Sequence, residues 1–384
     1  MNENYADQYT RAWLEVDLDA LVQNAQEVAK HVAPARLIPM VKANGYGLGA
    51  VEVAGALTRL EPYALGVATP GEGIELRDAG IEERIIVFAP GVIGEAEALL
   101  AGRLDISVFS LSSLRALDSR VRENGGSVGI HLEIDTGMGR AGFIASAAEE
   151  WVPQVAKIIE RGGVCVESAF THFHSAAEDG AVTAFQFKQF EASLTLLESA
   201  GVTVPLRHAS NSDAILHDRQ YHLNLVRPGI YMYGGRRGTG IKGPLPDPKV
   251  VASVRARILE VRSLAAGATL SYGAKYVTLR EESIATLGIG YADGIPWRPG
   301  SQGHAIVRGT RVPIRGSVCM DMTLLDVSAV SSVEPWSAVT LLGSEGDEEI
   351  TLADLAEIGQ TIEYEILTGF SQRVPRYYSP YLGA

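Results

Sequence analysis

Short runs of apolar and β-branched residues alternate with longer amphipathic stretches over about the first 235 residues of the chain. The apolar runs are continuous, which is typical of strands in a parallel sheet that is buried on both faces. They predict strands at residues 36–41, 63–67, 85–88, 104–109, 128–134, 163–170, 204–209 and 223–226. The stretches between them predict helices, among them 18–32, 47–60, 110–123, 146–161 and 181–200.

This repeated strand–helix pattern predicts an α/β fold. The length and number of the units favour a closed (β/α)8 TIM barrel over residues 12–235 rather than an open sheet. A connector rich in glycine and proline follows at 234–248. Beyond it, strand-like segments occur with one short helix at 351–358, which predicts a mainly antiparallel β-strand C-terminal domain over residues 236–384. We expect the N-terminal segment 1–11 to join that second domain.

Composition and charge narrow the class of protein. The 384 residues carry a formal net charge of −13, spread along the chain, which argues against nucleic acid or an anionic membrane as partner. Two cysteines, Cys165 and Cys319, give no disulfide framework. No apolar run is long enough to span a bilayer, and the first ten residues have no apolar signal core. We therefore expect a cytoplasmic protein.

Polar residues gather where the predicted barrel strands end. Lys42 ends the first strand and Arg227 ends the eighth. Arg140 follows the fifth strand, His172 follows the sixth, and the segment 210–212 follows the seventh. Because the C-terminal ends of barrel strands surround one mouth, these side chains are expected to form one site.

Lys42 is the most informative of these residues. A lysine after an apolar strand is often one that only extends its amine to the surface. Here, however, the residues that follow include Gly45, Gly47 and Gly49, which let the backbone turn sharply and approach a ligand. A desolvated amine has a lowered pKa and is suited to Schiff-base formation and proton transfer.

The segments after the seventh and eighth strands predict a phosphate site. Asn211 and Ser212 precede an apolar stretch and resemble a helix N-cap, while Gly229 and Ile230 offer further backbone N–H groups. Each segment alone is also compatible with an ordinary cap or turn. In one barrel mouth, a reactive lysine beside a phosphate site indicates pyridoxal 5'-phosphate as cofactor.

The same segments resemble the alanine racemase family, whose members are fold-type III enzymes that depend on pyridoxal phosphate. The similarity is carried by short motifs in order along nearly the whole chain. They are VKANGYGLGA (41–50), DTGMGRAG (135–142), THF (171–173), HASNSD (208–213), RPGIYMYG (227–234), LSYGAKY (270–276), GYADG (290–294), VCMD (318–321) and RVPR (373–376). The resemblance implies a homodimer with shared active sites that interconverts L- and D-alanine.

The resemblance also implies roles for individual residues. Lys42 and Tyr272, the latter from the partner subunit, would be the two catalytic bases on opposite faces of the substrate. The residues that would hold the cofactor are Lys42, Tyr46, His172, Asn211, Ser212, Arg227, Gly229 and Ile230. The small amino-acid substrate would be bound by Arg140, Met320 and Asp321. No spacing of histidine, cysteine and carboxylate indicates a metal site.

Three positions depart from the family pattern. Glu133 stands where many members carry a carbamylated lysine that orients the substrate-binding arginine, so we expect Glu133 to pair with Arg140 directly or through water. Gln372 stands where a tyrosine is expected to touch the phosphate, and Ser317 stands where an arginine is common at the entrance. These changes leave a racemase of another small amino acid, such as serine, as an alternative.

Three further alternatives remain open at this stage. A pyridoxal phosphate decarboxylase of the same fold would carry different motifs in its β domain. A non-catalytic carrier of the cofactor would need only the barrel. A catalytically silent relative would be expected to lose Lys42 or Tyr272, and both are present.

Overall fold

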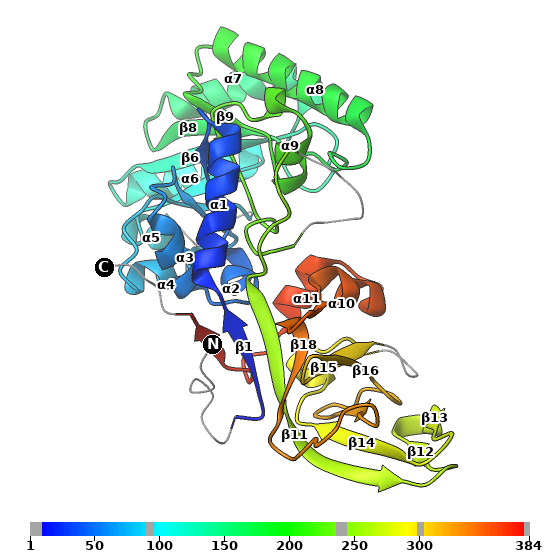
Figure 1. Cartoon of the computed structure of the whole chain (residues 1–384). Helices are drawn as coiled ribbons and strands as arrows, with labels where there is room; N and C mark the ends of the chain where they lie inside the picture. Colours follow the sequence, from blue (N-terminus) through cyan, green and yellow to red (C-terminus); the bar gives the residue numbers. More distant parts are fainter. Residues whose placement is uncertain (1–9, 90–95, 236–243, 298–302, 380–384) are drawn as a thin grey trace.

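The computed structural model describes residues 10–89, 96–235, 244–297 and 303–379. Figure 1 shows a barrel of strands and helices above an extended β sheet. The barrel strands are β2 (Arg36–Leu37), β3 (Leu65–Val67), β4 (Ile85–Val87), β5 (Leu104–Val108), β6 (Val128–Asp135), β8 (Val164–Phe170), β9 (Leu206–His208) and β10 (Leu225–Val226). Each lies within, or within one residue of, a run that the apolar pattern predicted.

These strands form a closed parallel barrel. Their order is β2-β10-β9-β8-β6-β5-β4-β3, and every pairing between them is parallel. A parallel bridge between Met40 and Gly66 joins the two ends of this order. The side chains of β4 are completely buried, as expected for strands covered on both faces. The predicted barrel is therefore confirmed. One short strand, β7 (Phe143–Ile144), pairs with β6 and was not predicted.

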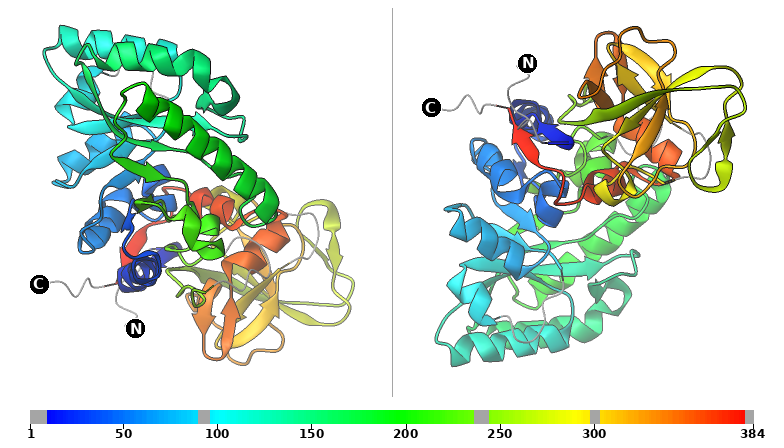
Figure 2. Two further views of the ribbon diagram at one scale, coloured as in Figure 1. Left: turned by 90° about the horizontal axis from the view of Figure 1, so that it is seen from above. Right: turned by 90° about the horizontal axis from the view of Figure 1, so that it is seen from below.

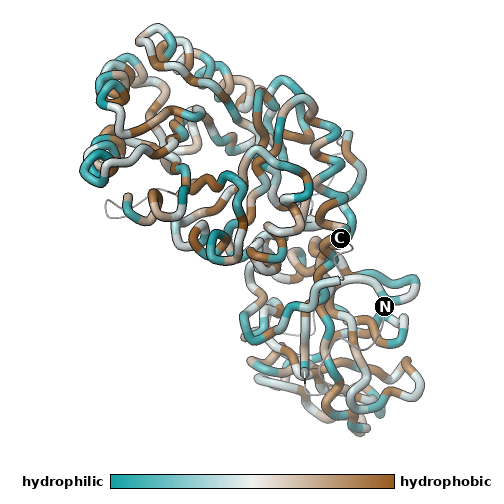
Figure 3. The backbone as a smooth tube through the Cα atoms, turned by 90° about the vertical axis from the view of Figure 1, so that its left-hand side faces the viewer, coloured by the Kyte–Doolittle hydropathy of each residue, from teal (hydrophilic) through white to brown (hydrophobic). Residues whose placement is uncertain are grey.

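Helices surround the barrel, as the two views in Figure 2 show. They are α1 (Leu18–Val32), α3 (Ala50–Thr58), α4 (Pro70–Asp78), α5 (Ala96–Ala101), α6 (Leu111–Glu123), α7 (Ala148–Ile159), α8 (Gly180–Ser199) and α9 (Ser212–His217). Side chains cap several of them, including Asp17 on α1 and Asp179 on α8. Figure 3 shows hydrophilic and hydrophobic positions alternating along the outer helices, the pattern of helices that pack one face on the barrel.

The second sheet is mainly antiparallel, as predicted. Its strands after the barrel are β11 (Ala252–Leu264), β14 (Glu282–Leu287), β15 (His304–Val307), β16 (Thr310–Pro313), β17 (Thr323–Asp326), β18 (Ala338–Glu345), β19 (Glu348–Ile350) and β20 (Arg376–Tyr378). A separate small ribbon pairs β12 (Thr269–Leu270) with β13 (Tyr276–Val277). The helix predicted at 351–358 is α10 (Leu352–Gly359), and a second one, α11 (Glu363–Gly369), follows it.

Strand β1 (Ala12–Val16) belongs to this second sheet although it precedes the barrel in the chain. It pairs antiparallel with β11 and parallel with β20, so that the first and last strands lie side by side (Figure 1). The division of the chain at residue 235 stays a prediction. The same holds for the placement of segment 1–11, of which residues 1–9 lie outside the described part. Within the described residues, no helix combines the length and the apolar character that crossing a membrane requires.

Candidate active site

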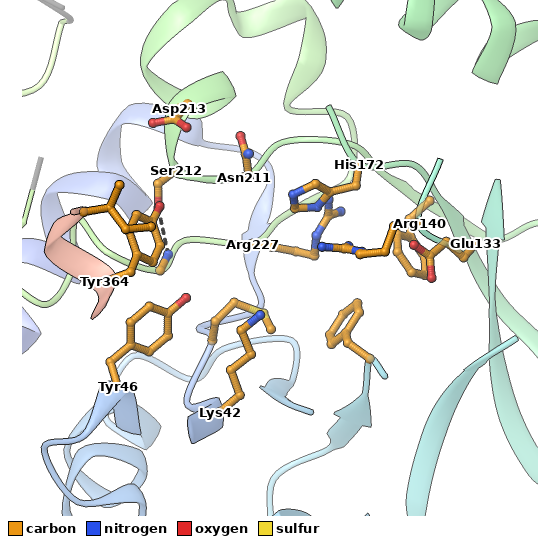
Figure 4. Close-up of a pocket in the computed structure, with 15 residues that line it drawn as sticks. Lys42, Tyr46, Glu133, Arg140, His172, Asn211, Ser212, Asp213, Arg227 and Tyr364 are labelled. Atoms are coloured by element: carbon orange, nitrogen blue, oxygen red, sulfur yellow. Dashed lines mark hydrogen bonds between the residues drawn. The ribbon is translucent and has the colours of Figure 1, made fainter. Parts of the chain in front are cut away.

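A cavity of about 350 Å³ lies at the C-terminal ends of the barrel strands. Its size is in the range of small-molecule sites. Figure 4 shows the side chains that surround it. The lining residues are Met40, Lys42, Tyr46, Phe88, Glu133, Arg140, Phe170, His172, Asn211, Ser212, Asp213, Arg227, Gly229, Ile362 and Tyr364. The structure thus brings together the predicted residues from the first, fifth, sixth, seventh and eighth strand ends.

Lys42 enters the cavity from an unusual turn. The three residues after it, Ala43, Asn44 and Gly45, have φ angles of 54°, 55° and 60°. The segment labelled α2 (Lys42–Tyr46) is therefore a left-handed turn, which costs energy for residues other than glycine. Two side chains support it: Glu72 accepts a hydrogen bond from the backbone N–H of Ala43 (2.8 Å), and Asn44 accepts one from that of Ala50 (2.8 Å).

The last strand of the chain holds the same turn from the other side. Arg376 donates from Nε and Nη2 to the carbonyl of Gly47, at 3.1 and 2.9 Å, and the hydroxyl of Tyr378 donates to the carbonyl of Leu48 at 3.0 Å. A Cβ at Gly47 would lie 2.3 Å from the carbonyl oxygen of Leu367, so the close approach of the turn to the backbone of α11 requires glycine at this position. Neither Arg376 nor Tyr378 was among the residues predicted for the site, although Arg376 ends the RVPR motif.

The amine of Lys42 has a lowered pKa. Burial is the main cause, and the positive charge of Arg140 adds to it, while Glu72 acts in the opposite direction. A lowered pKa increases the fraction of neutral amine at physiological pH, and the neutral amine is the form that acts as nucleophile and base.

One end of the cavity is rich in hydroxyl and N–H groups. Asn211 caps α9 by accepting from the N–H of Ala214 (3.0 Å), and Ser212 Oγ accepts from the N–H of Gly229 (2.9 Å). A Cβ at Gly229 would lie 2.5 Å from the hydroxyl oxygen of Tyr46, so glycine allows the backbone to reach that hydroxyl. Ile230, next in the chain, is buried and its side chain is not among the lining residues.

Tyr364 of α11 also lines this end and was not among the predicted site residues. Its ring centroid lies 6.0 Å from that of Tyr46, which itself stacks on Tyr233 at 4.4 Å. Gln372, which stands where the family pattern places a tyrosine that touches the phosphate, is exposed and does not line the cavity. An aromatic side chain is therefore present, supplied by a helix that the apolar pattern did not predict.

Arg227 forms the floor of the site. Its side chain is 5% exposed and donates to His208 Nδ1 (2.7 Å) and to the carbonyls of Thr171 (2.9 Å) and Ala209 (3.0 Å). Burial lowers the pKa of Arg227 to about 10, so it remains a cation at neutral pH. His172 lies beside it (Figure 4). Burial, together with the charge of Arg227, lowers the pKa of His172 to about 3, so its ring is neutral.

Arg140 and Glu133 lie at the end of the cavity opposite Tyr364 (Figure 4). Burial raises the pKa of Glu133 to about 7, while Arg140 and Arg227 act in the opposite direction. Both residues line the cavity. No ion pair within 4.0 Å joins Glu133 to Arg140, both of which lie in the described part of the chain, so the direct pairing that we predicted is not formed, and pairing through water stays a prediction.

The pKa of Glu133 leads to a prediction about substrate binding. Its carboxyl is mainly protonated below pH 7 and anionic above it. The family resemblance implies that Arg140 binds the carboxylate of the substrate, and a Glu133 anion would cancel part of the positive charge available for that contact. We expect KM for the amino-acid substrate to rise about 2- to 5-fold as pH increases through 7. The Glu133→Gln variant, measured by steady-state kinetics over the same pH range, should lose this step in KM. A Glu133→Gln variant whose KM rises as in the parent would contradict the assignment.

The remaining predicted residues lie outside the cavity. Tyr272, at the start of a 3-10 turn (Tyr272–Ala274), is 76% exposed, and Met320 is 52% exposed. Asp321 accepts from Arg373 Nη2 (2.6 Å), whose Nε donates to Asp293 (2.7 Å). Ser317 is buried, and its carbonyl accepts a hydrogen bond from the hydroxyl of Ser271 (2.6 Å), next to Tyr272 in the chain. One chain alone therefore does not assemble all predicted residues.

The fold is a closed (β/α)8 barrel joined to a β domain, and the mouth of the barrel holds a lysine, two arginines and a hydroxyl-rich end. These features define the class of protein as a two-domain barrel enzyme. The family model for the alanine racemase N-terminal domain matches residues 16–237, and that for the alanine racemase C-terminal domain matches residues 251–378. The chain therefore belongs to the alanine racemase family, and the protein is an isomerase.

Individual relatives support this assignment. The chain is 37% identical to an alanine racemase of Halothermothrix orenii, over 97% of each chain, and 38% identical to one of Symbiobacterium thermophilum, over 95% of this chain and 96% of the relative. The crystal structure of alanine racemase from D-cycloserine-producing Streptomyces lavendulae has a TM-score of 0.92 at 33% identity, covering 98% and 99% of the two chains. A Bartonella henselae alanine racemase with covalently bound pyridoxal phosphate has a TM-score of 0.85 at 26% identity, covering 96% of this chain and 100% of that one.

Proposed function

We propose that the protein interconverts L- and D-alanine with pyridoxal 5'-phosphate as cofactor, using Lys42 and the partner subunit's Tyr272 as its two bases. The observation that carries this proposal is the position of Lys42 in the cavity. Its amine lies between a hydroxyl-rich end, with Tyr46 and Ser212, and a cationic end, with Arg140 (Figure 4).

The residues present fit the cofactor. The end formed by Tyr46, Ser212 and the backbone of Gly229 and Ile230, with Asn211 beside it, offers two hydroxyls and the N–H of Ile230 to a phosphate. The N–H of Gly229 donates to Ser212 Oγ (2.9 Å) and so holds that hydroxyl, and Gly229 leaves space there that a Cβ would fill. Lys42 would bind the aldehyde, Arg227 would face the pyridine nitrogen, and His172 would lie along the ring. When bound, pyridoxal phosphate supplies an electron sink for the carbanion of the amino acid.

The chain's own residues do the remaining work. Arg140 binds and orients the substrate carboxylate by its positive charge. In one direction, the neutral Lys42 amine accepts the α-proton at Nζ on one face, and the phenol of the partner subunit's Tyr272 donates a proton from Oη on the other face. In the reverse direction, the phenolate at Oη accepts the α-proton and the ammonium at Nζ donates one. Arg227 keeps its own protons, because even its lowered pKa of about 10 lies well above neutral pH, so it gives none to the pyridine nitrogen.

Exposure of the β-domain residues supports a homodimer. Tyr272 and Met320 are large apolar side chains that are exposed to solvent. A cluster of such exposed side chains is unusual on a soluble monomer and indicates a surface that packs against another protein. Other exposed large apolar side chains in the same sequence region are Val277, Leu279, Tyr291 and Met322. We propose that this surface packs against the barrel mouth of a second copy and brings Tyr272 and Met320 to its cavity.

Mixing two inactive variants tests the shared site. Lys42→Ala and Tyr272→Phe should each be inactive alone, because each lacks one base. In a mixed dimer, one site carries both changes and the other carries neither. After dissociation and reassociation of an equal mixture, we expect racemase activity to return to about a quarter of the parent value. Activity would be measured by polarimetry with L-alanine, and the mixed dimer by ion-exchange chromatography, since the two variants differ by one lysine.

Two controls make the mixing experiment decisive. Each variant taken through the same procedure alone should stay inactive. L-Serine assayed beside L-alanine distinguishes the alternative substrate, and the absence of released carbon dioxide excludes decarboxylation. A mixture that remains dimeric, binds cofactor and stays inactive would mean that both bases come from the same chain.

A further inference from the structure

A chain of polar side chains runs through the interior of the barrel, away from the cavity. It begins at Arg227, whose Nη1 lies 2.7 Å from His208 Nδ1. His208 Nε2 lies 2.9 Å from Ser168 Oγ, and that oxygen lies 2.6 Å from His131 Nδ1. His131 Nε2 lies 3.5 Å from Oδ2 of Asp105, the second residue of β5 and thus at the opposite end of the barrel from the cavity.

The chemistry of the two ends fixes the direction in which hydrogen bonds are donated along these side chains, from Arg227 to Asp105. Arg227 can only donate, so His208 must accept at Nδ1 and, being neutral, carries its proton at Nε2. Burial, with the charge of Arg227, lowers the pKa of His208 far below its usual value, which keeps it neutral. Ser168 then accepts from His208 and donates to Nδ1 of His131. His131 therefore carries its proton at Nε2 and points it at the carboxylate of Asp105, which can only accept.

The surroundings protect this arrangement from water. His131, Ser168 and His208 are completely buried, and the ring of Phe170 stacks on His208 with centroids 4.8 Å apart. Interiors of such barrels are normally filled with apolar side chains. Buried polar groups cost free energy unless they are all hydrogen-bonded, so a fully connected chain of this kind needs both of its ends.

Asp105 is held in its place by its neighbours. Arg84 Nη1 lies 3.0 Å from Asp105 Oδ2 and 2.6 Å from Glu167 Oε2. A Cβ at Gly129 would lie 2.4 Å from Asp105 Oδ1, so glycine there makes room for the carboxylate. The pairing of β6 with β8 shifts register between Ile130 and His131, a bulge that sets His131 opposite Ser168.

We propose that Asp105 is a positioning residue for the active site, acting through His131, Ser168 and His208 to keep the guanidinium of Arg227 in place. Without its carboxylate, His131 is free to carry its proton at Nδ1, and the chain can run in the opposite direction. His208 would then present an N–H to Arg227, and two donors would face each other. Arg227 would move, and its place facing the pyridine nitrogen of the proposed cofactor would be lost.

The first test uses the protein without cofactor, so its result does not depend on the proposed function on which the inference rests. Protein labelled with ¹⁵N-histidine should show, by NMR, that His131 and His208 are both neutral and protonated only at Nε2. In Asp105→Leu, we expect the two nitrogens of His131 to shift toward averaged values. A His131 that is doubly protonated or carries its proton at Nδ1 in the parent protein would overturn the proposal.

The second test measures binding of pyridoxal phosphate by its absorbance. Asp105→Leu should weaken affinity about 3- to 10-fold, the effect of losing one well-placed hydrogen bond. Asp105→Asn keeps an acceptor oxygen and should stay within about 2-fold of the parent. The matched control is Glu167→Gln, which alters the same charged group around Arg84 but not the acceptor of His131. An equal loss in Glu167→Gln would assign the effect to charge and refute the proposal.

Two further variants keep the test informative if Asp105→Leu does not fold. Gly129→Ala should displace the carboxylate by its methyl group and reproduce the shift of the His131 nitrogens. Ser168→Ala interrupts the chain at its centre, so adding Gly129→Ala to it should weaken cofactor affinity no further. Additive losses in this pair would show that Asp105 does not act through Ser168, and the proposal would fall.

Discussion

Racemase activity of a Lys42→Ala variant should fall by at least ~1000-fold, because the change removes both a base and the attachment point of the cofactor. The amine of Lys42 lies in the cavity, where burial and the charge of Arg140 lower its pKa. The turn that carries Lys42 is held by Glu72 from one side and by Arg376 from the other. The hydrogen bonds that hold the turn come from Glu72 and Arg376 and not from the side chain of Lys42, so the fold should persist. Polarimetry with both L- and D-alanine measures the loss.

A small amine added to the solution provides the control for this variant. Methylamine fits the space left by the lysine side chain and should restore part of the activity in proportion to its concentration, while the parent should not respond. Lys42→Arg keeps the positive charge but not a titratable amine, so it should be as inactive as Lys42→Ala and should not be rescued. Activity within about tenfold of the parent in Lys42→Ala would remove Lys42 from the mechanism.

The parts of the fold that follow local pattern could be predicted from the sequence. Each barrel strand is a continuous apolar run, and a buried strand of this kind needs no knowledge of its neighbours to be recognised. Lys42 and Arg227 were found for the same reason, since each follows directly on such a run. The convergence of the strand ends in one mouth is a property of the barrel, not of any single segment.

Contacts between distant segments could not be predicted in this way. Strand β1 pairs with β11 and β20, which are about 240 and 360 residues away, and no local pattern encodes such a pairing. Arg376 and Tyr364 reach the site from the end of the chain, beyond the segment that forms the barrel. The inward histidines His131 and His208 sit in runs that their neighbours make apolar, so the chain they form appears only when the strands are paired.

Reversing the charge of Arg227 should have the second largest effect. In Arg227→Glu, a carboxylate replaces the guanidinium, and the three hydrogen bonds that the guanidinium donates to His208, Thr171 and Ala209 are lost. It would also lie near Glu133, whose pKa is already raised to about 7 by burial and which loses the opposing effect of Arg227. We expect racemisation to slow by about 100-fold or more, the upper range for losing a buried charged partner.

The more informative result is the ratio of products. A glutamate can share a proton with the pyridine nitrogen, whereas Arg227 retains its own, so the ring would withdraw electrons more strongly in the variant. Transamination should therefore increase relative to racemisation, measured as pyruvate formed per D-alanine produced. Arg227→Lys is the matched control: it loses hydrogen bonds but keeps a cation, so it should be slow without the change in product ratio. If Arg227→Glu and Arg227→Lys give the same ratio as the parent, the charge at this position does not decide the course of the reaction, and Arg227 serves only to hold the floor of the cavity.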